Sequence, residues 1–126
     1  MSYDLYFWRE EKATGNSPEE MMNLLQDDGP QPELATWPIS KVKDTFREFF
    51  PEVTDEGLQL WWEGAGSSFN VGFGYSDERH AKMFVVMCGY KLLDSPDTMN
   101  RIIDVGHRLG CALYDPQENQ RFQQPD

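Results

Sequence analysis

Apolar and polar residues alternate along several short segments of the chain, which is the pattern of half-buried β-strands. In residues 3–8, for example, Leu5 and Phe7 face one way while Asp4 and Tyr6 face the other. Residues 80–90 are instead apolar on both faces, which predicts a strand in the centre of a sheet. The predicted strands are residues 3–8, 58–63, 68–75, 80–90 and 111–114.

Short turns join three of these strands directly. Residues 64–66 read Gly-Ala-Gly, and residues 76–79 form a second polar connection. Strands that follow one another through turns this short pair in antiparallel fashion. The middle of the chain is therefore predicted to be an antiparallel meander.

Three other segments repeat their apolar residues every three to four positions, as amphipathic helices do. The first follows Ser17, an N-cap residue, with Pro18 at its first position. The last follows Ser95, with Pro96 at its first position, and is predicted to end at Gly110.

The remaining helix is predicted to begin around residues 38–40 and to be stopped by Pro51. One side of it carries Ile39, Val42, Phe46 and Phe49. The other side carries Lys41, Lys43 and Arg47. We interpret the basic side as a face in contact with solvent.

The elements follow the order strand, helix, helix, three strands, helix, strand. This order predicts an α+β fold with a mostly antiparallel five-stranded sheet and helices packed on one face. Residues 1–115 are expected to form a single domain, followed by a polar C-terminal tail at 116–126. Because each helix has one apolar stripe, the other face of the sheet is either open to solvent or covered by a partner.

The chain of 126 residues has 22 acidic and 11 basic side chains, a formal net charge of −11. Nucleic acid and anionic membranes are therefore not expected as partners, because both are bound by an excess of Lys and Arg. The N-terminal residues are acidic rather than basic and apolar, and no apolar run is long enough for a membrane helix. We expect a cytoplasmic location, with Cys88 and Cys111 as free thiols buried in the core.

Residues that bind metals or cofactors are not grouped in the sequence. His80 and His107 lie far apart, with no Cys or acidic cluster at ligand spacing beside them. Residues 64–68 are rich in Gly and Ser but precede a strand, whereas a phosphate-binding loop precedes a helix. The sequence predicts no cofactor, no metal and no catalytic residues, so we do not expect an enzyme.

The outer face of the predicted sheet combines aromatic, carboxylate and amide side chains. Such a surface buries large rings and pairs with cationic groups, as protein interfaces do. An alternative is that loops or the tail cover these aromatic residues and form a second small core. The predicted partner-binding residues are Asp4, Tyr6, Trp8, Gln59, Trp61, Glu63 and Asn70.

Several short stretches resemble a group of small acidic bacterial proteins, the immunity proteins of polymorphic and contact-dependent toxin systems. They are residues 3–8, the capped helix start at 17–20, the aromatic meander, and Leu-Tyr-Asp-Pro-Gln at 113–117. The resemblance implies a cytoplasmic protein that binds a cognate toxin domain and blocks its active site. It transfers no functional residue, because these motifs are not catalytic.

These observations give three hypotheses. The first is an immunity-type protein that neutralises a toxin domain with a cationic cleft, towards which a charge of −11 would steer it. The second is a structural protein that forms a homodimer or larger homo-oligomer through the open sheet face. The third is a small enzyme that uses carboxylates, for instance Glu63 with His80 or Asp77.

Overall fold

The computed structural model describes residues 2–10, 20, 23, 34–64, 66–115 and 120–122. In this part of the chain, eight strands form one sheet. Every strand pairing in it is antiparallel. The strands are β1 (Ser2–Trp8), β2 (Trp37–Pro38), β3 (Thr54–Asp55), β4 (Gln59–Gly64), β5 (Ser67–Tyr75), β6 (His80–Gly89), β7 (Ala112–Asp115) and β8 (Gln120–Phe122).

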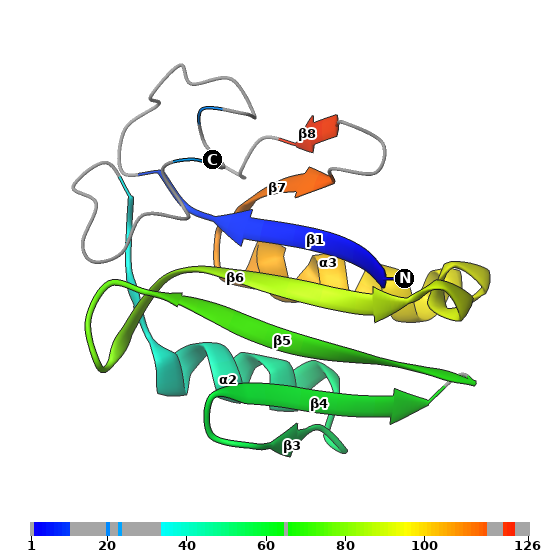
Figure 1. Ribbon diagram of the computed structural model, residues 1–126. Helices are drawn as coiled ribbons and strands as arrows, with labels where there is room; N and C mark the ends of the chain where they lie inside the picture. Colours follow the sequence, from blue (N-terminus) through cyan, green and yellow to red (C-terminus); the bar gives the residue numbers. More distant parts are fainter. Residues whose placement is uncertain are drawn as a thin grey trace.

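The sheet has the order β3-β4-β5-β6-β1-β7-β8, which can be followed from bottom to top in Figure 1. The short strand β2 pairs with the first residues of β6. The N-terminal strand β1 therefore lies inside the sheet, between β6 and β7, although both partners come much later in the sequence. The α+β class and the mostly antiparallel sheet are as predicted.

The five predicted strands correspond to β1, β4, β5, β6 and β7, and β6 lies in the interior of the sheet as its apolar pattern indicated. The sequence analysis missed β2, β3 and β8. Each has only two or three residues, which is too short for an alternating pattern to be recognised. β8 lies within the segment that we expected to be a polar tail, and it extends the sheet by pairing with β7.

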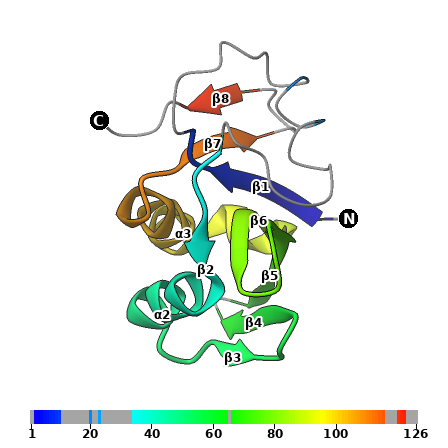
Figure 2. The same ribbon diagram turned by 90° about the vertical axis from the view of Figure 1, so that its left-hand side faces the viewer.

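Two α-helices, α2 (Ile39–Phe49) and α3 (Pro96–Arg108), lie on the same side of the sheet (Figure 2). A 3-10 helix, η1 (Tyr90–Asp94), connects β6 to α3. α2 ends where Pro51 was expected to stop it, because a residue before proline is disfavoured in the helical region, and the φ of −135° and ψ of 80° of Phe50 lie outside that region. The helix predicted after Ser17 lies outside the described residues, apart from Glu20 and Asn23.

Both ends of α3 follow the predicted signals. Ser95 occupies the N-cap and Pro96 the first helical position. At the other end Gly110 has a φ of 74°, a left-handed conformation that favours glycine. The amide of Cys111 donates to the Gly106 carbonyl at 2.8 Å, which satisfies a carbonyl that the helix itself leaves unpaired.

The main core lies between the helices and the sheet, and aromatic rings run through it from β1 to β4. Phe7 stacks on Phe84 with 4.8 Å between ring centroids, and Phe46 from α2 meets Phe84 edge-on at 5.6 Å. Further along, Phe50 contacts Phe69 at 4.9 Å. These contacts tie α2 to the adjacent strands, so the position of the helix depends on the central strands.

The two cysteines are free and buried in this core, as predicted. Burial disfavours the charged thiolate and raises the pKa of Cys88 to about 12. It also raises the pKa of Cys111. Both side chains therefore pack as small apolar groups at neutral pH.

The carboxylate of Asp55, on β3, pairs with two basic side chains of α2. Asp55 accepts from Lys43 Nζ at 2.9 Å and from Arg47 Nη2 at 3.2 Å. It also accepts from the backbone amide of Gly57 at 2.8 Å. The pKa of Asp55 is lowered below its usual value of 3.8. The hydrogen bond from the Gly57 amide is the largest cause, and the one from the Lys43 ammonium group is the next. Lys43 and Arg47 therefore pair with β3 rather than only with solvent.

We expect Asp55→Asn to lower the free energy of unfolding by about 0.5–1 kcal/mol at pH 7, because the pair is partly exposed and screened. A lowered carboxyl pKa stabilises the fold above the pKa of the unfolded chain, and this contribution is lost as the pH falls through the folded pKa. Urea unfolding should therefore show the difference at pH 7 and little of it at pH 2. An equal difference in the free energy of unfolding at both pH values would contradict this explanation. The matched control is Glu52→Gln, which neutralises an exposed carboxylate.

Candidate functional site

The outer face of the sheet, opposite the helices, collects six of the seven predicted partner-binding residues on one open surface. The strand register places Trp61 opposite Asn70, Asn70 opposite Met87, and Met87 opposite Asp4. In the next row, Gln59 is opposite Gly72, Gly72 opposite Val85, and Val85 opposite Tyr6. We call this surface the outer-face patch, and it comprises Asp4, Tyr6, Gln59, Trp61, Glu63, Asn70, Gly72, Val85 and Met87.

Trp8 does not belong to this open surface, which corrects our prediction for that residue. Its side chain lies on the outer face but is completely buried, packed with Leu34, Met83 and Ala112. The cover forms because the chain returns over the sheet here: Glu10 forms a β-bridge with Leu34. The alternative of a second small core is therefore right for the Trp8 end of the face, and Tyr6 and Val85 of the patch pack against that core.

Hydrogen bonds between side chains fix the polar members of the patch. Trp61 Nε1 donates to Glu63 Oε1 at 3.1 Å. Asn70 Nδ2 donates to Gln59 Oε1 at 3.1 Å, and Gln59 in turn donates to Glu56 at 3.0 Å. Side chains that are already held in place lose less conformational entropy when a partner binds. The patch is therefore preorganised for binding.

Two apolar side chains from β6, Val85 and Met87, complete the patch between the polar residues. Sequence reasoning missed them because it interpreted β6 as buried on both faces, whereas both are half-buried. The signal was present, since they occupy the positions of β6 that register with Tyr6 and Asp4 on the outer face of β1. Between Gln59 and Val85 lies Gly72, which adds no side chain to the surface.

Gly72 is not required by the packing of the strands. A Cβ atom built there would lie 3.5 Å from side-chain atoms of Met87 and Val85, an ordinary van der Waals contact. Its backbone also lies outside the left-handed region. Larger side chains at this position should therefore alter the surface and leave the sheet intact, which makes Gly72 a useful site for blocking the patch.

The charge of the patch is negative. Its carboxylates are Asp4 and Glu63, and none of its members is Lys or Arg. Burial, followed by the charge of Asp4, raises the pKa of Tyr6, so its phenol stays neutral and remains a hydrogen-bond donor. The patch thus combines a large ring, apolar side chains and anionic groups.

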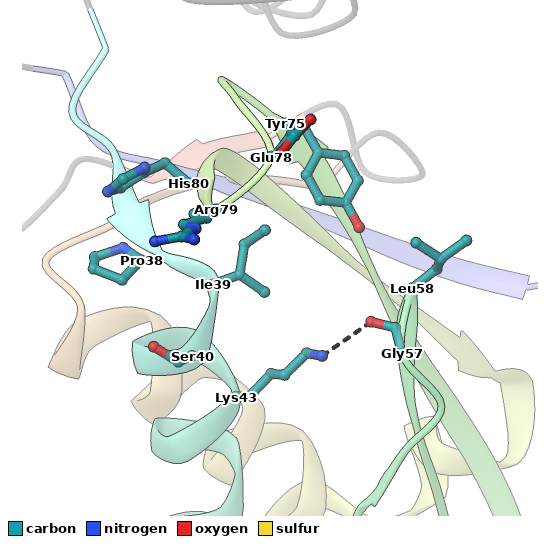
Figure 3. Close-up of a pocket in the computed structure, with 10 residues that line it drawn as sticks. All are labelled: Pro38, Ile39, Ser40, Lys43, Gly57, Leu58, Tyr75, Glu78, Arg79 and His80. Carbon is teal, nitrogen blue, oxygen red and sulfur yellow. Dashed lines mark hydrogen bonds between the residues drawn. The ribbon is translucent and has the colours of Figure 1, made fainter.

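Apart from the patch, a groove lies at the end of the sheet, between the start of α2, the β3–β4 loop and the β5–β6 turn (Figure 3). It is an open groove of about 630 Å³. Leu58, which is 79% exposed, and Tyr75, 36% exposed, line it from the strand side. Lys43 reaches across it to donate to the Gly57 carbonyl at 2.9 Å, as Figure 3 shows.

The residues suggested for an enzyme are only partly brought together. Asp77 accepts from His80 Nδ1 at 2.9 Å within the β5–β6 turn, and the pKa of Asp77 is lowered by the Arg79 amide and by His80. Glu63 is opposite Ser68 near the start of β5, whereas His80 follows the end of that strand. The suggested pairing of Glu63 with His80 or Asp77 is therefore wrong, because the antiparallel register places them at opposite ends of β5.

In the parts of the chain that the structure describes, no group of three or more His, Cys, Asp or Glu side chains is arranged to hold a metal ion. Among the same residues, no helix combines the length and apolar character needed to cross a membrane. No protein-family model, curated protein sequence or solved structure matches this chain.

Proposed function

We propose that this chain is an immunity-type protein, which binds a cognate toxin domain through the outer-face patch and thereby neutralises it in the cytoplasm. The observation that supports the proposal is the state of Trp61. This half-buried indole is held by Glu63, flanked by amide side chains and surrounded by patch residues none of which is basic. Half-exposed Trp rings in such settings are typical hot spots of protein interfaces.

Electrostatics suggest the character of the partner. A net charge of −11 attracts a cationic surface over a distance of about a Debye length and speeds its association. Asp4 and Glu63 would then face basic side chains of the partner, while Trp61, Val85 and Met87 would supply the buried apolar contact. A domain with a cationic active-site cleft fits both requirements.

The proposal predicts that the gene immediately upstream encodes a large secreted protein with a toxic C-terminal domain, and the test uses that domain. We expect that domain to bind the wild-type chain and to lose its toxicity in co-expression. Trp61→Ala should weaken binding at least tenfold in calorimetry, or about 1.4 kcal/mol. Gly72→Arg should weaken it similarly, because it places a bulky cation in the middle of the patch.

Two variants elsewhere on the surface serve as controls. Tyr90→Ala removes an aromatic side chain that is 42% exposed on η1, and Glu52→Lys reverses an exposed charge outside the patch. Both should bind like the wild type. The proposal for the patch fails if Trp61→Ala and Gly72→Arg bind as tightly as these controls.

The same variants distinguish the homo-oligomer. If the sheet face instead joins two copies of this chain, the wild type will sediment as a dimer and Gly72→Arg as a monomer, with no dependence on a toxin domain. A wild-type monomer in sedimentation, together with a one-to-one complex with the toxin domain, would support the immunity-type function.

A further inference from the structure

An open surface cavity of about 520 Å³ lies where the end of β1, residues 35–37, the first turn of α2 and the C-terminal end of α3 meet. Lys41, His107 and Arg108, which line it, are exposed. None of the described lining residues is Asp or Glu. Four of its described lining residues have basic or imidazole side chains. These four are Arg9, Lys41, His107 and Arg108. We propose that this cavity binds the phosphate group of a small organic phosphate of about nucleotide size.

The concentration of positive charge is unusual for this chain. Acidic residues outnumber basic ones by 22 to 11, yet three of the 11 Lys and Arg residues line this single cavity. Like charges that lie near one another repel, and an anion bound among them would offset this repulsion. The sequence does not reveal the cluster, because its members come from three segments far apart in the chain.

Most of these groups lack a carboxylate partner. Within the described part of the chain, Arg9 donates from Nη1 to the Gly110 carbonyl at 3.2 Å, and the side chains of Lys41 and His107 have no ion pair. Arg108 is different, because it pairs with Glu48. Three of the four groups are therefore available to an anion.

The helix dipole explains only part of the cluster. His107 and Arg108 lie in the last turn of α3, where cations are stabilised by the negative end of the dipole. Lys41 lies in the first turn of α2, where the positive end disfavours a cation, and that turn holds no acidic residue. Its position thus has no explanation from helix stability and fits a role in anion binding.

Arg9 is held in place for such a role. Gly110 adopts a left-handed φ of 74°, and the Arg9 guanidinium lies so close that a Cβ atom at Gly110 would overlap Nη1. The backbone of Arg9 is fixed as well, since its carbonyl accepts from the Ala35 amide at 2.8 Å. A guanidinium has five donors in a rigid fork, so those not used by Gly110 suit the oxygens of a phosphate.

The size and walls of the cavity indicate the rest of the ligand. Its volume falls in the range of small-molecule sites, roughly 300–1,000 Å³, and is more than a bare phosphate ion fills. Trp37, Ala35 and Leu109 also line it, but each is buried, so the surface open to a ligand is mainly polar. An extended polyanion such as nucleic acid would be repelled by the net charge of −11, whereas a compact dianion interacts chiefly with the local cations.

The test is a titration of the labelled full chain with adenosine 5′-monophosphate, inorganic phosphate and adenosine, followed by amide chemical shifts. We expect saturable binding of the nucleotide with a dissociation constant below about 1 mM. Inorganic phosphate should bind more weakly at the same amides, in residues 35–37 and 107–110, and adenosine should not saturate. Lys41→Glu should weaken nucleotide binding at least tenfold.

Lys91→Glu is the matched control, because it changes the net charge equally at an exposed lysine on η1 away from the cavity. It should leave the dissociation constant within about twofold of the wild type. The proposal is overturned if neither phosphate compound saturates, if adenosine binds as well as the nucleotide, or if both charge reversals weaken binding equally. It does not depend on the proposed toxin partner, since these readouts use the isolated chain.

Discussion

Replacing Phe84 by alanine is expected to lower the free energy of unfolding by about 4 kcal/mol, the largest effect of any single substitution that we predict. Phe84 lies on the central strand β6 and is completely buried. Its ring stacks on Phe7 and meets Trp37 and Phe46 edge-on, with centroids 6.2 and 5.6 Å away. Three elements converge on this ring, so the backbone cannot collapse into the space that its removal would leave.

Urea unfolding followed by fluorescence will measure the effect, with Tyr90→Ala as the control. Tyr90 is an aromatic residue of similar size, but it is 42% exposed and lies outside the core. Its loss should cost less than about 1 kcal/mol. A Phe84→Ala variant that lost as little as Tyr90→Ala would mean that the rings around Phe84 do not form the centre of the core.

Gly106→Ala is expected to destabilise the fold by about 2–3 kcal/mol, although the same exchange within a helix normally gains up to about 1 kcal/mol. The sign reverses because α3 packs directly on β1 at this point. A Cβ atom on Gly106 would lie 2.5 and 2.6 Å from Cε1 and Cδ1 of Phe7. Phe7 cannot move aside easily, since it is buried and stacked on Phe84.

The control for this exchange is Gly72→Ala, which adds the same methyl group on the open side of the sheet. There the new atom would make only ordinary contacts at 3.5 Å. We expect thermal unfolding to shift by several degrees downwards for Gly106→Ala and by little for Gly72→Ala. A Gly106→Ala variant at least as stable as the wild type would show that the helix and strand can separate at no cost.

Local patterns in the sequence were sufficient for the elements that depend on local chemistry. Alternation located the longer strands, and Ser95, Pro96 and Gly110 marked the ends of α3. Alternation also placed the predicted partner-binding residues of β1, β4 and β5 on one face, because a side chain's face follows from its position along the strand. These predictions needed no information about distant parts of the chain.

What the sequence did not reveal depends on contacts between distant segments. Trp8 follows the same alternation as Tyr6, and its burial becomes evident only from its contacts with distant residues, among them Leu34, which forms a β-bridge with Glu10. Lys41 is exposed, as its place on the basic side of α2 predicted, but its proximity to Arg9 could not be predicted, because Arg9 follows a strand far away in the sequence. Such juxtapositions arise from the topology of the sheet, which short-range periodicity does not encode.

The interior position of β1 has a consequence for the order of events during synthesis on the ribosome. β1 is made before the rest of the sheet, yet β6 begins about 70 residues after it and β7 about 100 residues after it. Until then Leu5 and Phe7 have no complete sheet to join, although local hairpins such as β4–β5 can already form. Sheets closed by such distant pairings form slowly, and their unpaired strands invite aggregation. A chaperone that shields the nascent N-terminal segment should therefore raise the yield of folded protein.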